Sequence, residues 1–226
     1  MPKPSTIAID GTAASGKSTV GELLARSLEY LYFDTGVMYR AVTWATLERA
    51  IDIEDVEAVS RLAETLRIEV ESEGPDDGRQ YTVLADGQDV TWDIRSPAVE
   101  AAISRVSSYP RVRAALIAQQ RRIAEPGSIV MVGRDIGTVV LPEADLKIFM
   151  RASVEERARR RYKDALAQGK PADFDEILAA IRERDRQDRE KPISPMVPAA
   201  DAIIIDTDKL TIEDVLAQVK QLVADR

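Results

Sequence analysis

Five short runs of apolar residues divide the chain, and stretches with helical periodicity lie between them. The runs occupy residues 6–10, 30–33, 129–133, 146–150 and 202–206. Runs of this length and continuity are typical of strands that are buried on both faces of a parallel sheet. Between them, apolar residues recur every three or four positions, as expected of helices. The pattern predicts an α/β fold with a doubly wound, five-stranded parallel sheet.

The region 67–93 departs from this pattern. Residues 67–71 alternate between polar and apolar, 74–78 read Gly-Pro-Asp-Asp-Gly, and 81–84 indicate a second short strand before the turn Asp86-Gly87. Such features are typical of antiparallel strands joined by tight turns. We therefore predict one domain over residues 1–226, with a core of about 5–66 and 94–226 and a β-rich insert of about 67–93.

Two arginine-rich helices are predicted near the end of the chain. The first begins at Ser153 with a capping box, the second covers about 174–190, and Gly169-Lys170-Pro171 joins them. We interpret residues 153–191 as a mobile lid. Ordinary surface pairs at i, i+4 spacing, Glu155 with Arg159 and Glu156 with Arg160, would explain the same charges.

Spacing separates the charged residues of the second lid helix into two faces. Arg184, Asp188 and Lys191 fall at i, i+4 and i+7, so they share one face. Another face carries Arg182, Arg186 and Arg189. The first face would look into a binding cleft, while the second would pair with solvent or with a triphosphate.

Composition narrows the chemistry that the chain can perform. The 226 residues are 45% hydrophobic and 31% charged, with a net charge of −8. The negative charge argues against a nucleic-acid partner, and no apolar run is long enough to span a membrane. Because the chain has no Cys, His or Asn, we exclude disulfides, thiol nucleophiles and His-based triads or zinc sites. We expect a cytoplasmic monomer with small-molecule substrates.

The first apolar run leads directly into a phosphate-binding pattern: Gly, four residues, Gly-Lys-Ser. Its backbone N–H groups and the start of the following helix would bind the phosphates of ATP. Lys17 would add a cation, and the Ser18 hydroxyl would bind Mg²⁺. An ordinary Gly/Ser turn is the alternative, although the strand before the loop and the helix after it favour phosphate binding. The expected ATP-binding residues are Gly11, Thr12, Ala13, Ala14, Ser15, Gly16, Lys17, Ser18 and Thr19.

Two further strand ends carry residues suited to anions. Asp34-Thr35-Gly36 follows the second run and leads into a helix that carries Arg40. Gly133-Arg134-Asp135 follows the third run. Open α/β sheets build their sites at the carboxyl ends of strands. A capped helix with an exposed arginine remains an alternative for the first of these features.

Taken together, these strings resemble the cytidylate kinases, a family of nucleoside monophosphate kinases. The resemblance covers essentially the whole chain, and the string Gly133-Arg134-Asp135-Ile136-Gly137-Thr138-Val139-Val140 and the β-rich insert are specific to that family. It implies transfer of a phosphoryl group from ATP to CMP or dCMP, with Mg²⁺, in pyrimidine nucleotide metabolism. Lys17, Arg134 and the lid arginine Arg157 would neutralise the developing charge.

The resemblance also implies which residues bind CMP. Arg40, Arg134 and the hydroxyl of Thr35 would hold the phosphate. Three residues would read cytosine, and two would contact the ribose. The chain departs from the family at Thr35, where Ser is usual, and at Lys191, where Arg is usual, so the contact of residue 191 loses a bidentate fork. The cytosine readers are Ser104, Arg113 and Asp135, and the ribose contacts are Arg184 and Asp188.

Two alternatives stay open at this stage. A P-loop kinase could act on a different acceptor, such as UMP or another small alcohol or phosphate. A GTP-binding switch is the alternative from another class, but such switches read guanine with an Asn-Lys-x-Asp string, and this chain has no Asn.

Overall fold

The computed structural model describes residues 3–71, 74–79, 81–167, 169, 171–190 and 196–226. The chain forms two compact units. The first contains residues 1–34 and 124–226, and the second contains residues 35–123. Among the described residues, no helix is long and apolar enough to cross a membrane.

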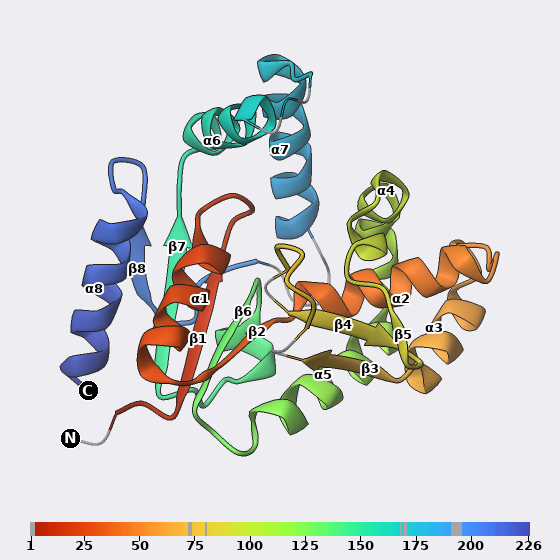
Figure 1. The fold of residues 1–226 in the computed structure, drawn as a ribbon, viewed down its shortest axis with the longest axis horizontal. Helices are drawn as coiled ribbons and strands as arrows, with labels where there is room; N and C mark the ends of the chain where they lie inside the picture. The colour runs from red at the N-terminus through yellow and green to blue at the C-terminus, as the bar shows by residue number, and fades with distance from the viewer. Residues whose placement is uncertain (1–2, 72–73, 80, 168, 170, 191–195) are drawn as a thin grey trace. The chain divides into compact units, whose positions relative to one another are not determined.

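The first unit is built on a five-stranded parallel sheet, as predicted (Figure 1). Its strands lie in the order β2-β6-β1-β7-β8, so the first strand is central. On one side the chain runs first to the edge strand β2 and later returns to β6 beside β1, and on the other side it continues outward through β7 to β8. This order places the carboxyl ends of β1, β2 and β6 next to one another, where a site can form. The strands are β1 (Thr6–Gly11), β2 (Leu31–Asp34), β6 (Ile129–Gly133), β7 (Leu146–Arg151) and β8 (Ile203–Asp206).

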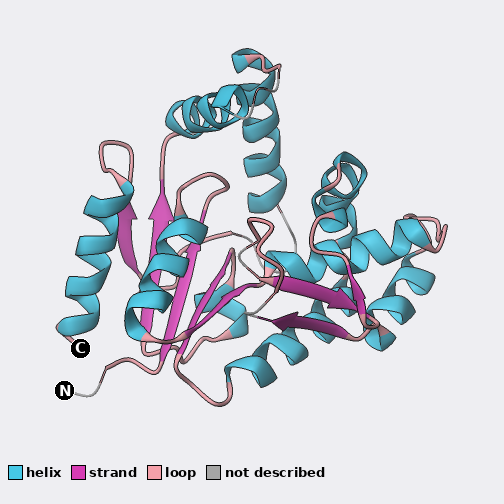
Figure 2. Ribbon diagram, viewed as in Figure 1, coloured by secondary structure: helices cyan, strands magenta, loops and turns pink. Residues whose placement is uncertain are grey.

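Helices α1 (Lys17–Leu28) and α8 (Ile212–Ala224) contact each other and cover one face of this sheet (Figure 2). Ile7 and Ile9 of β1 point to that face and join Leu24 of α1 and Val219 of α8 in one buried cluster. Register explains the pattern, because Ile7 and Ile9 stand beside Val130 and Val132 of β6. Alternate residues of every central strand therefore pack against these two helices.

Helices α6 (Val154–Ala167) and α7 (Phe174–Arg189) also belong to the first unit and pack against each other. The Ser153 hydroxyl accepts the N–H of Glu156 at 3.2 Å, as the capping box predicts. The reciprocal bond is replaced, because the N–H of Ser153 donates to Asp208 at 2.6 Å. Glu156 pairs with Arg160, as expected, and also with Arg159, whereas Glu155 reaches across to Arg182 of α7.

The second unit combines helices with a small antiparallel sheet, in the order β3-β4-β5. Helix α3 begins at Asp55, whose carboxylate accepts the N–H of Ala58 at 2.9 Å. The elements of this unit are α2 (Gly36–Glu48), α3 (Val56–Thr65), β3 (Ile68–Glu71), β4 (Thr82–Ala85), β5 (Gln88–Asp89), the short 3₁₀ helix η1 (Asp93–Arg95), α4 (Pro97–Val106) and α5 (Pro110–Ala124).

Two features of the fold were absent from the sequence prediction. Strand β5 has only two residues, which is too short for an alternating pattern to be recognised. A π-helical turn, η2 (Ile136–Val140), follows β6, and its five residues are mostly apolar, like those of a strand. The second unit groups residues 35–66 and 94–123 with the small antiparallel sheet, because α2 packs against α3, α4 and β4. From the sequence we assign these helices to the core instead.

Candidate active site

The loop between β1 and α1 has the backbone geometry of a phosphate cradle. β1 ends at Gly11, and α1 begins at Lys17. Gly11 has φ +154°, and a Cβ on it would lie 2.0 Å from the Met150 carbonyl oxygen, so only glycine fits. The side-chain oxygens of Thr12 and Ser15 are buried and make no hydrogen bond within the described residues. The loop thus combines free helix-start N–H groups with unused hydroxyls, which suits an anion.

Lys17 folds back over the loop, and its Nζ donates to the Thr12 carbonyl at 3.2 Å. The pKa of Lys17 is lowered to about 8, mainly by burial and also by the nearby cations of Arg134 and Arg184, against the opposing charges of Asp34 and Asp10. Three cations therefore gather around the phosphate loop. Such a concentration of like charge is unfavourable without an anion to share it.

The carboxyl end of β2 lies beside the start of α1. Ser18 Oγ donates to Asp34 Oδ2 at 3.3 Å, which brings two hard oxygens next to the phosphate loop. Mg²⁺ typically binds one or two protein oxygens together with phosphates and water. Within the described part of the chain, no cluster of three or more metal-ligating side chains occurs. The pair Ser18 and Asp34 offers oxygen atoms that fit an Mg²⁺ bound together with a triphosphate.

The turn after β6 contributes Arg134, whose guanidinium pairs with Asp188 of α7. Asp188 is buried, Arg184 is half-buried on the same helix face, and Arg182 and Arg186 are exposed. This arrangement confirms the two faces predicted from the spacing. The structure therefore brings Lys17, Arg134, Arg184 and Asp188 together in the first unit.

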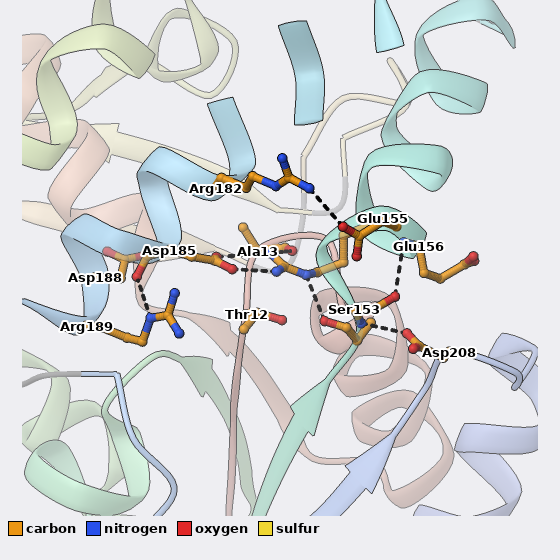
Figure 3. Close-up of polar contacts among 12 residues, drawn as sticks. Thr12, Ala13, Ser153, Glu155, Glu156, Arg182, Asp185, Asp188, Arg189 and Asp208 are labelled. Atoms are coloured by element: carbon orange, nitrogen blue, oxygen red, sulfur yellow. Dashed lines mark hydrogen bonds and ion pairs between the residues drawn. The ribbon is translucent and has the colours of Figure 1, made fainter. Parts of the chain in front are cut away.

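Arg157 of α6 lies in a separate network of polar contacts, whose labelled members in Figure 3 include Ala13 and Asp185. The residue is 1% exposed, and its guanidinium forms two bonds with the Asp185 carboxylate, at 3.0 and 2.5 Å. The same guanidinium donates to the carbonyl oxygens of Ala152 at 3.0 Å and Ala13 at 3.3 Å. Arg157 therefore links both lid helices to the back of the phosphate loop.

The predicted CMP-binding residues of the second unit lie on α2, α4 and α5. Arg40 pairs with Glu100 at 2.5 Å. Arg113 is buried, stacks over the Tyr39 ring at 5.5 Å and donates to the Ser107 carbonyl at 3.4 Å. The Ser107 hydroxyl in turn donates to the Ser104 carbonyl at 3.2 Å. Ser104 and Arg113 are thus joined through Ser107.

The remaining predicted residues are placed as follows. Thr35 is buried at the start of α2, and Asp135 is buried at the start of η2. Thr19 is exposed on α1, and Lys191 lies outside the described residues. Sequence reasoning assigned no role to Asp10, Asp34 or Asp185. The signal was available for Asp10, which is a carboxylate at the end of an otherwise apolar run.

A parallel sheet whose first strand delivers a Gly-x₄-Gly-Lys-Ser loop to the start of a helix defines the P-loop class of nucleoside triphosphate-binding proteins. A family model described as cytidylate kinase matches residues 7–225. The chain belongs to the cytidylate kinase family.

Curated relatives agree with this assignment, and one solved structure shares the fold. The "Cytidylate kinase" of Chloroflexus aggregans is 54% identical over 93% of this chain and 90% of that protein. The "Cytidylate kinase" of Roseiflexus castenholzii is 52% identical over 100% of this chain and 96% of that protein. The crystal structure of an uncharacterized protein from Eubacterium ventriosum has 13% identity and a TM-score of 0.52, covering 97% of this chain and 98% of that one; it supports the fold alone.

Proposed function

We propose that this protein transfers the γ-phosphoryl group of ATP to CMP or dCMP, giving ADP and CDP or dCDP. The observation that carries the proposal is the gathering of cations at the phosphate loop. Arg134 and Arg184 lie close enough to Lys17 to add to the lowering of its pKa by burial, in a chain with a net charge of −8. Phosphoryl transfer is catalysed mainly by positioning and by charge stabilisation, which these groups supply.

On the donor side, residues 11–19 bind the phosphates of ATP. Lys17 leaves the Thr12 carbonyl and turns toward the β- and γ-phosphates, where its charge offsets the charge of the transition state. Ser18, with Asp34 behind it, would hold an Mg²⁺, which would supply positive charge to offset the charge of the triphosphate. Arg157 acts from behind the loop, because its guanidinium is already occupied by Asp185 and by two backbone carbonyls.

On the acceptor side, Arg40, Arg134 and Thr35 bind the phosphate of CMP. Arg134 first releases Asp188, which then becomes available for the ribose together with Arg184. Cytosine presents an N4 amino donor and an N3 acceptor, so its site needs an acceptor opposite N4 and a donor opposite N3. The Asp135 carboxylate and the Ser104 hydroxyl accept, and Arg113 donates. Lys191 completes the set of residues proposed for CMP.

The experiment that tests the proposed function follows the products directly. The purified protein with ATP, Mg²⁺ and CMP should form ADP and CDP in equal amounts, separated by anion-exchange chromatography. Lys17→Ala should lose roughly 10²-fold or more in activity, since one charge-stabilising group is removed. Lys220→Ala, an exposed lysine of α8, is the matched control and should keep full activity. ADP formed without CDP would contradict the proposal.

A kinase for another acceptor remains the competing proposal within the same class. UMP shares the phosphate and ribose of CMP and differs in the base edge alone. The same assay separates the two, because an enzyme with a cytosine-reading carboxylate should discriminate strongly between the bases.

A further inference from the structure

The structure assigns Asp10 as a positioning residue that fixes the turn carrying Arg134 and Asp135. Asp10 ends the apolar part of β1 and stands beside Gly133, the last residue of β6. Its carboxylate accepts two consecutive backbone N–H groups, that of Ile136 at Oδ1 and that of Gly137 at Oδ2, each at 2.7 Å. These donors follow directly after the two residues proposed to bind CMP. The inference rests on the proposed function and goes beyond it.

The contact solves a problem that is specific to this turn. Residues 136–140 form a π-helical turn in which the N–H of Val140 donates to the Asp135 carbonyl at 3.2 Å. The first N–H groups of any helical turn have no partner within it, and here those of Ile136 and Gly137 are buried. An aspartate at the start of such a turn usually caps it with its own carboxylate. Asp135 does not cap η2, because Asp10 takes that role from another strand.

The capping of this turn by Asp10 in place of Asp135 has a functional consequence. The Asp135 carboxylate does not cap its own turn, so its proposed role in reading the base does not compete with a capping bond. Asp10 is held in place because β1 is central in the sheet. Its carboxylate then fixes the start of the turn through the N–H groups of Ile136 and Gly137. Arg134 and Asp135 therefore receive their positions from the same strand that delivers the phosphate loop.

Both carboxylate oxygens are needed for this role, so the charged form of Asp10 is the active one. The pKa of Asp10 is raised to about 6, mainly by burial and to a smaller extent by the nearby Asp135. The two backbone N–H groups and Lys17 lower this pKa and so act in the opposite direction. At neutral pH the group is therefore ionised, with an acceptor for each N–H. The Lys147 ammonium, on neighbouring β7, is held by Asp201 at 2.8 Å.

Gly137 limits the turn from the opposite side. A Cβ on Gly137 would lie 3.2 Å from Lys147 Cδ and 3.4 Å from Asp10 Oδ2. The turn is thus enclosed between the Asp10 carboxylate and the aliphatic stem of Lys147. A methyl group at residue 137 would displace the turn slightly while leaving Asp10 intact.

The test compares Asp10→Asn with a matched control, an aspartate outside β1 that bonds to the other end of that strand. An asparagine has one acceptor oxygen, and its NH₂ group would face the second N–H. Asp145→Asn makes the same chemical change at the other end of β1, where Asp145 accepts from the Thr6 N–H at 2.9 Å. We expect kcat/KM for CMP to fall roughly 10–100-fold in Asp10→Asn, the scale of a small misplacement of substrate-binding groups. The KM for ATP should change far less, and Asp145→Asn should match the wild type.

Hydrogen exchange gives a second measurement that does not depend on activity. Exchange of the amides of residues 134–141 should be faster in Asp10→Asn than in the wild type or in Asp145→Asn. If Asp10→Asn fails to fold, Gly137→Ala should give the same pattern with a smaller change. Wild-type kcat/KM for CMP and unchanged exchange in a folded Asp10→Asn protein would overturn the assignment of Asp10, with the proposed function intact. Absence of CMP phosphorylation by the wild-type protein would instead refute the proposed function, and exchange would still test Asp10.

Discussion

Replacing Asp185 with asparagine would leave the Arg157 guanidinium charged and without its carboxylate partner. Arg157 is only 1% exposed, so water would not replace that partner. Removing one partner of a buried ion pair typically costs about 3–5 kcal/mol, because the remaining charge is neither hydrated nor neutralised. For a protein of this size, each 1 kcal/mol lowers Tm by about 2–4 °C. We therefore expect Asp185→Asn to lower Tm by roughly 6–20 °C, measured by calorimetry without nucleotide.

A matched control exists between the same two helices. Glu155 and Arg182 also join α6 to α7, but their side chains are 55% and 60% exposed. Water and salt screen exposed pairs, which contribute little to stability, so Glu155→Gln should shift Tm far less than Asp185→Asn does. A double variant, Arg157→Met with Asp185→Leu, removes both buried charges and should recover most of the lost stability.

The activity of the double variant separates the role of Arg157 in stability from its role in positioning the phosphate loop. The double variant lacks the bond from Arg157 to the Ala13 carbonyl, at 3.3 Å, so the phosphate loop loses a support. It should remain folded but have lower kcat than the wild type. If Asp185→Asn were no less stable than Glu155→Gln, the buried pair would not hold the lid helices as argued. Full activity in the double variant would remove Arg157 from the catalytic account.

Four further predictions concern Lys17, the lid helices and Asp135. Lys17→Ala should be as stable as the wild type at pH 7. The pKa of Lys17 is lowered to about 8 in the folded protein, so its charged form, which is present below that pH, opposes folding. Urea unfolding at pH 7 checks this expectation, and a large loss of stability would contradict it. In the wild type, kcat/KM for ATP should fall as pH rises above about 8, since Lys17 loses its charge. Exchange in α6 and α7 should slow when a bisubstrate analogue binds, with α8 as the unchanged control, and no change in the lid would make its arginines surface charge alone. Asp135→Ala should lose more activity on CMP than on UMP, since an unpaired buried polar group costs about 1–3 kcal/mol; equal losses would place Asp135 outside the base pocket.

The parts of the fold that follow from local pattern could be predicted from the sequence. Central parallel strands are buried on both faces, so 129–133 and 146–150 appear as unbroken apolar runs, and β6 and β7 occupy those positions. The phosphate loop could also be predicted from the sequence, because its glycines meet a local backbone requirement and its lysine supplies a local charge. The i, i+4 spacing also separated the buried Asp188 from the exposed Arg182 on α7.

The contacts that depend on distant chain segments could not be predicted. Asp10 accepts N–H groups that are 126 and 127 residues away, and nothing near Asp10 in the sequence indicates them. Arg134 pairs with Asp188 across 54 residues, a contact that only the sheet order and the position of α7 create. Composition indicates that charged residues will pair, but only the fold selects the partners.

The discrimination between CMP and UMP by the wild-type protein tests the central claim most directly. A coupled assay of ADP release, with ATP and Mg²⁺ fixed and each nucleoside monophosphate varied in turn, gives kcat/KM for CMP, dCMP and UMP. The account predicts that CMP and dCMP exceed UMP by roughly 10²-fold or more, the scale of hydrogen-bond readout in a closed site. Equal values for CMP and UMP, or a preference for UMP, would contradict it.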